Sequence, residues 1–217
     1  MNYFAHAMHF LDRPYLAVAS GVPDMLMVVD RDVRVRSKHV AAFVDHDDPV
    51  QADVARGILQ HFRDDLRFHG TRAFVELNLG LAAAIREALD GDAGPRPRFL
   101  AHLLVEVLLD AALIAERPER LEAYYRALAV VDADAVQTAL NQMAPRPSRH
   151  LAEMIRAVAR ERFLWDYLED GTLMVRLNQV LRRVGLETVP PEFQSQLGSM
   201  RRQVAARQEE LLEGIPV

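Results

Sequence analysis

Histidines and carboxylates at helical spacing are the residues of this sequence best suited to chemistry. Two series of three such residues, each with four-residue steps, occur in the chain: His61, Asp65 and His69, and His102, Glu106 and Asp110. Residues four apart lie on one face of a helix, because four residues advance the helix by about 400°. The second series stands in an almost wholly apolar stretch, where a carboxylate is costly to bury without a partner. We therefore expect the two stripes to face each other across one metal-binding, hydrolytic site.

The types of candidate ligand limit which metal ions the site could bind. Imidazole and carboxylate ligands without thiolates suit Mn, Fe, Zn or Mg, and a divalent ion activates bound water and polarises phosphoryl oxygens. Two residues of the N-terminal segments join the candidate ligands, which are His6, Asp24, His61, Asp65 and His102. The candidates for proton transfer or for orienting the ligands are His69, Glu106 and Asp110. Asp64 points about 100° away from Asp65 and is expected to be exposed or to support the ligands.

A second interpretation stays open. A histidine and a carboxylate on neighbouring helices can satisfy each other without a metal. The stripes would then be a buried polar network in a non-catalytic helical interaction protein.

Composition limits the class of protein. The chain has 217 residues, half of them hydrophobic, a net charge of −5 and no cysteine. These values give no general case for binding nucleic acid or membrane, exclude disulfides and thiolate ligands, and are compatible with a cytoplasmic protein. We read no signal peptide in the first residues. One small basic cluster is either a solvated connector or a docking patch for an acidic partner or a phosphate: Arg31, Arg34, Arg36 and Lys38.

The hydrophobic pattern predicts an all-α fold without strands. A buried central helix is expected over about 98–116, within one multi-helix domain of residues 1–189. A polar C-terminal helix, within residues 190–217, is expected to pack on that domain or at the interface of a homodimer. Further helices are predicted over about 49–68, 71–89, 118–131, 132–143, 148–169 and 172–184, from N-caps, prolines and glycines at their ends.

Three short segments follow the pattern of one known family. The chain opens Met1-Asn2-Tyr3-Phe4-Ala5-His6, continues at residues 57–65 as GILQHFRDD, and contains VQTALNQMAPR at residues 136–146. These segments resemble the MNFLAH-type start, the G-I-x-x-H-R-x-x-D segment and the L-N-x-M-A-x-R stretch of bacterial acyl-carrier-protein phosphodiesterases, with Arg63 one place later than in the second pattern. The helix that carries His102 falls where that family has another helix bearing His and Asp. The chain differs from the family at Asp24, which follows a shorter segment, and at Phe68 and His69, which replace a Thr-Asp pair.

The resemblance implies an HD-like, all-helical, metal-dependent phosphohydrolase. Its expected metal is Mn, with Fe or Zn as alternatives. Its expected activity is hydrolysis of the phosphodiester that joins 4′-phosphopantetheine to a serine of acyl carrier protein, or of another phosphoester substrate.

Overall fold

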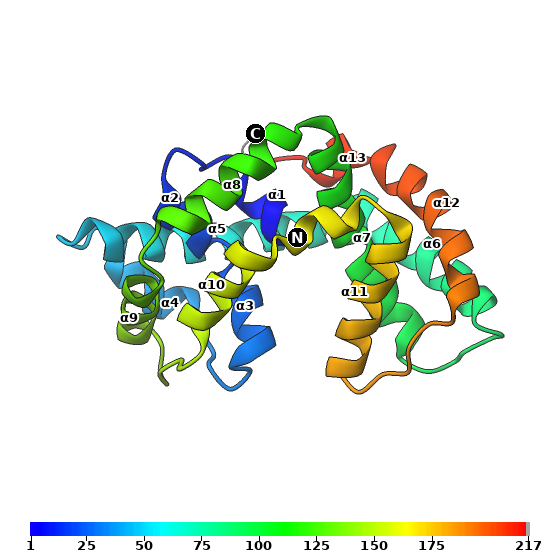
Figure 1. Ribbon diagram of the computed structural model, residues 1–217, viewed down its shortest axis with the longest axis horizontal. Helices are drawn as coiled ribbons and strands as arrows, with labels where there is room; N and C mark the ends of the chain where they lie inside the picture. Colours follow the sequence, from blue (N-terminus) through cyan, green and yellow to red (C-terminus); the bar gives the residue numbers. More distant parts are fainter. Residues whose placement is uncertain (216–217) are drawn as a thin grey trace. The chain divides into compact units, whose positions relative to one another are not determined.

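The computed structural model describes residues 1–215, and within them every regular element is a helix (Figure 1). The all-α prediction is therefore confirmed for this part of the chain. No helix in these residues is both long and apolar enough to cross a membrane.

The chain packs into two compact units, each built from two separate stretches of sequence. Unit 1 comprises residues 1–66 and 117–162, and unit 2 comprises residues 67–116 and 163–215. The helices of unit 1 are α1 (Tyr3–Ala7), α2 (Pro14–Ala19), α3 (Val22–Val29), α4 (Ser37–Val40), η1 (Ala41–Phe43), most of α5 (Pro49–Gly70), α8 (Pro118–Val130), α9 (Ala133–Met143) and α10 (Leu151–Glu161). Those of unit 2 are the last turn of α5, α6 (Arg72–Ala88), α7 (Arg96–Glu116), η2 (Phe163–Tyr167), α11 (Asp170–Arg183), η3 (Pro191–Phe193), α12 (Gln194–Ala205) and α13 (Gln208–Leu211).

Local capping explains where the long helices begin. Asp48 Oδ1 accepts a hydrogen bond from the Val50 amide at 2.9 Å, just before the proline that opens α5. Thr71 Oγ1 accepts from the Phe74 amide at 3.1 Å and separates α6 from α5. Asp132 caps α9 in the same way. These starts agree with the sequence prediction.

Each unit has its own packing. In unit 1, α10 packs against α3, α8 and α9, and α2 packs against α8. In unit 2, α6, α12 and η2 pack on α7, which is the central helix of that unit. The predicted helix over about 98–116 is thus observed as α7, and the C-terminal α12 packs on it.

Two predicted helices are shorter than expected. The helix predicted over 148–169 ends at Glu161, because Arg162 adopts a left-handed conformation with φ of 51°. The last predicted helix is divided into η3, α12 and α13, with Arg207 as a non-helical residue between the last two. Helical periodicity continues through both breaks, so the pattern alone did not reveal them.

Candidate metal centre

One group of side chains that could hold a metal ion lies in unit 1. His6 comes from α1, and His61 and Asp65 come from successive turns of α5. Their ligand atoms all lie within 4.8 Å of one another, so the group can hold a metal ion. The two imidazole rings stack with centroids 4.2 Å apart. Both histidines are buried, whereas the Asp65 side chain is 32% exposed, so the group opens to solvent on the carboxylate side.

Backbone geometry fixes the tautomer of His61. Its Nδ1 lies 2.9 Å from the carbonyl oxygen of Ser20, an acceptor only, so Nδ1 carries the proton and Nε2 keeps its lone pair. That Nε2 lies 3.5 Å from Asp65 Oδ2 and 4.0 Å from Asp24 Oδ1. Burial, and the neighbouring His6, lower the pKa of His61 to about 3. His61 is therefore neutral at physiological pH, and its Nε2 lone pair could bind a metal ion.

A buried carboxylate, that of Asp64, contacts the His6 ring nitrogen opposite the one near Asp65. Its Nδ1 lies 3.5 Å from Asp64 Oδ2, and Gln60 Nε2 donates to Asp64 Oδ1 at 2.7 Å. The fully buried Nε2 of His6 makes no hydrogen bond, although Asp65 Oδ1 lies 3.4 Å away. Burial lowers the pKa of His6, but Asp64 and Asp65 outweigh it and raise this pKa above its usual value. His6 therefore holds a proton more readily than a free imidazole does, and a metal ion bound at its Nε2 would take the place of that proton.

Asp65 is the common partner of these groups. Its Oδ1 also accepts a hydrogen bond from the amino group of Met1 at 2.6 Å, while Oδ2 faces His61. Burial raises the pKa of Asp65, but the two histidines and the amino group together hold it far below its usual range. Asp65 is consequently ionised at physiological pH, as a carboxylate that binds a metal ion must be.

A close helix contact places the Ser20 carbonyl. Gly57 of α5 faces the end of α2, and a Cβ there would stand 2.5 Å from the Leu16 carbonyl oxygen and 2.7 Å from Ala19 Cβ. Only glycine permits this approach, which brings the following residue, Ser20, to His61 one turn further along α5.

The second predicted stripe belongs to unit 2, where it forms a separate group. His69 Nε2 and His102 Nε2 lie 3.0 and 3.1 Å from the same oxygen, Glu106 Oε1. The stripe on α7 runs from surface to core: the side chain of His102 is 46% exposed, that of Glu106 is 16% exposed, and Asp110 is fully buried. The expectation that the whole stripe is buried is therefore wrong at His102. Asp110 lies outside this group of ligand atoms.

The candidate ligands thus fall into two groups, one in each unit, where the sequence suggested a single site. From the sequence, His6 is only a further candidate ligand beside the two helical series, whereas in the structure it is one of the three members of the group in unit 1. The support from Asp64 and Gln60 was not predicted in detail. The four-residue step from Gln60 to Asp64 is visible in the sequence, but it repeats the spacing of His61 and Asp65 on another face.

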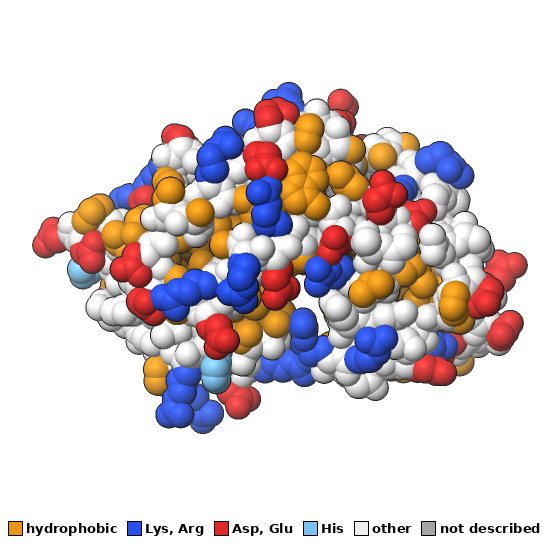
Figure 2. Space-filling view, viewed as in Figure 1, with side chains coloured by type: hydrophobic (Ala, Val, Ile, Leu, Met, Phe, Trp, Pro, Cys, Tyr) orange, Lys and Arg blue, Asp and Glu red, His pale blue; other side chains and the backbone are white. Residues whose placement is uncertain are grey.

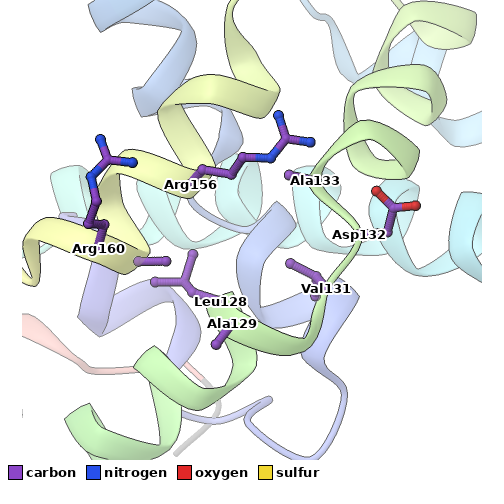
Figure 3. A pocket seen from close by; sticks show the side chains of 8 residues that line it. Leu128, Ala129, Val131, Asp132, Ala133, Arg156 and Arg160 are labelled. Atoms are coloured by element: carbon purple, nitrogen blue, oxygen red, sulfur yellow. The ribbon is translucent and has the colours of Figure 1, made fainter.

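A hollow elsewhere in unit 1 contains none of the candidate residues. In Figure 3 the side chains of Arg156 and Arg160 extend from α10 near the connection between α8 and α9. Arg156 pairs with Asp134, which offsets part of the positive charge. The other residues lining this hollow are Leu128, Ala129, Val131, Asp132, Ala133 and Ala159.

No protein-family model, curated protein or solved structure matches the chain.

Proposed function

We propose that unit 1 is a metal-dependent phosphodiester hydrolase whose metal, Mn²⁺ in preference to Fe²⁺ or Zn²⁺, is held by His6, His61 and Asp65. One observation carries this proposal: two imidazole Nε2 atoms and an ionised carboxylate converge, and one of these nitrogens is buried without a hydrogen bond. Two nitrogens and carboxylate oxygens suit a divalent ion of intermediate hardness. Two of the three segments that resemble acyl-carrier-protein phosphodiesterases contain His6, His61 and Asp65, which supports the same assignment.

The residues around the group supply the remaining functions. A bound ion lowers the pKa of water and polarises a phosphoryl oxygen. The Ser20 carbonyl and the Asp64 carboxylate orient His61 and His6, as outer partners do in metal sites. Asp24 lies at the solvent side with its carboxylate 32% exposed, and in this proposal it accepts the proton of the attacking water. All of these residues belong to unit 1.

The substrate class follows from the resemblance and from charge. We propose the 4′-phosphopantetheine linkage of acyl carrier protein as the scissile bond. An acidic carrier protein needs basic docking residues. The four predicted ones are all exposed: Arg31, Arg34, Arg36 and Lys38. Figure 2 shows basic and acidic side chains interspersed over the face in view, as expected for a net charge of −5. A local basic cluster, not the overall charge, must therefore attract an acidic partner.

The test combines metal content with hydrolysis. Purified protein, stripped of metal and then supplied with Mn²⁺, is analysed by elemental mass spectrometry and assayed on holo acyl carrier protein and on a small phosphodiester. Asp65→Asn removes the shared carboxylate charge with little change of shape, and Asp47→Asn, at an exposed position, is the matched control. We expect Asp65→Asn to lose one ion per chain and the activity, and Asp47→Asn to keep both.

Two results would overturn the proposal. One is a wild-type protein that hydrolyses neither substrate with Mn²⁺, Fe²⁺ or Zn²⁺ present. The other is an Asp65→Asn variant with unchanged activity. The first result would favour the alternative of a buried polar network in a non-catalytic interaction protein.

A further inference from the structure

We infer that His69, His102 and Glu106 form a second divalent-metal site, of the zinc type, which is independent of the group in unit 1. All three residues belong to unit 2: His69 lies in the last turn of α5, and the other two lie one turn apart on α7.

The two distances from Glu106 Oε1 to the imidazole nitrogens are those of ligands around one ion, and all three ligand atoms lie within 4.8 Å of one another. Both imidazole nitrogens lie 3.0–3.1 Å from Glu106 Oε1. Ligands at about 2.1 Å from a common ion are about 3.0 Å apart at right angles and about 3.4 Å apart in a tetrahedron. A cation can therefore take the place of the two protons between the imidazoles and Oε1.

The ring orientations are fixed by packing. The two imidazoles stack with centroids 4.9 Å apart and an interplanar angle of 24°. Phe74 presents its ring edgewise to both of them, at 4.7 Å from His69 and 5.1 Å from His102. Phe68 packs on His69 and on Phe74. Side chains held by aromatic neighbours lose little rotamer freedom on binding, which favours affinity.

The charge and exposure of the group indicate how it binds. Glu106 supplies the carboxylate of the group, and its Oε1 lies within 3.1 Å of both imidazole nitrogens. The His102 side chain is nearly half exposed, so an ion here keeps a side open to water or to an external ligand. Two histidines, one glutamate and an open position are the ligand set of several zinc enzymes. The site is thus suited to Zn²⁺, bound close to solvent.

An ion at this position links two helices. His69 belongs to the end of α5, and His102 and Glu106 belong to the middle of α7. A ligand that binds only the folded protein stabilises it, so Zn²⁺ must raise the melting temperature through this link.

The test is Zn²⁺ titration of the metal-stripped full chain by calorimetry, with thermal unfolding in parallel. His102→Ala is the main variant, because the side chain of His102 is the most exposed of the three, and unfolding of the metal-free variant measures what the loss of its ring contacts costs. We expect this variant to bind one Zn²⁺ fewer than the wild type and to lose a rise of about 5 °C in melting temperature. Glu106→Gln should weaken the same binding step at least tenfold. His46→Ala, at another exposed histidine, should behave as the wild type.

The outcome is independent of the function proposed for unit 1. Asp65→Asn, which disables only the first group, should still bind the ion that His102→Ala loses. Equal Zn²⁺ stoichiometry and equal thermal shifts in the wild type and His102→Ala would overturn the inference. A loss of the same size in His46→Ala would also overturn it, because the binding would then be nonspecific.

Discussion

His61 Nδ1 lies 2.9 Å from the carbonyl oxygen of Ser20, and this contact determines which nitrogen of the imidazole can bind a metal. Without it, either nitrogen could carry the proton. With it, Nε2 keeps its lone pair and points toward Asp65 and Asp24. The carbonyl belongs to the residue that ends α2, so the position of a short helix controls the chemistry of a residue on α5.

Gly57→Ala tests this control. A Cβ at position 57 would meet the Leu16 carbonyl oxygen and Ala19, so α2 must move away from α5. We expect the free energy of unfolding to fall by about 1–3 kcal/mol and Mn²⁺ affinity to fall with it. Urea unfolding and Mn²⁺ titration measure the two effects. Gly80→Ala is the control, because a Cβ at position 80 would have no neighbouring atom within 4 Å and alanine favours the helix. A Gly57→Ala variant as stable as Gly80→Ala would contradict the close contact.

Asp64→Asn tests the support behind His6. Asp64 is buried, contacts His6 Nδ1 and accepts a hydrogen bond from Gln60. Loss of its charge should weaken Mn²⁺ binding about 10–100-fold, the usual effect of altering an outer partner of a metal ligand. The far-ultraviolet circular dichroism spectrum should stay unchanged. Asp47→Asn, at an exposed site, should bind Mn²⁺ as the wild type does.

The sequence predicted the helices more completely than the sites. Proline, aspartate and threonine at the ends of α5, α6 and α9 act locally, so their effects are visible in the sequence. The pairing of side chains between helices is not local. His61 and His69 share a stripe, but eight residues carry a helix about 80° past two full turns. The two histidines therefore meet different neighbours, His6 in one case and His102 in the other.

Asp30, at the end of α3, forms pH-dependent hydrogen bonds with the residues just before α10 in unit 1. Its carboxylate accepts hydrogen bonds from Ser148 Oγ and from the amides of Arg149 and His150, just before α10 begins. Partial burial raises the pKa of Asp30, but these bonds and the His150 side chain outweigh it and lower the pKa to about 2. The native pKa is thus below that of the unfolded chain. The stabilisation is complete above about pH 4 and disappears as the pH falls toward 2.

Asp30→Asn should therefore lower the free energy of unfolding by about 1–2 kcal/mol at pH 7. The difference from the wild type should shrink between pH 4 and pH 2, because the wild-type carboxylate is then protonated. Denaturant unfolding at several pH values measures this difference. A difference that stays constant down to the acid limit would show that the charge of Asp30 does not contribute.

The basic cluster can be tested apart from the metal. Alanine at all four positions, Arg31, Arg34, Arg36 and Lys38, should raise KM for holo acyl carrier protein about tenfold through slower association. Hydrolysis of a small phosphodiester should be unaffected, because that substrate makes no protein–protein contact. The effect should diminish at high ionic strength, which screens exposed charges. Equal loss on both substrates would contradict a docking function.

Arg162 ends α10 in a left-handed conformation, and its side chain makes two contacts with α8. Its guanidinium pairs with Glu122 and lies 4.7 Å from the centre of the Tyr125 ring. Arg162→Ala should destabilise the protein, because it loses these contacts and keeps the unfavourable backbone conformation. Arg162→Gly loses the same contacts but relieves the backbone, so it should be more stable than Arg162→Ala by about 1 kcal/mol. Thermal and urea unfolding of the two variants separate the contributions. Equal stability of the alanine and glycine variants would contradict this prediction. It would mean that the backbone leaves the left-handed conformation once the contacts with Glu122 and Tyr125 are lost.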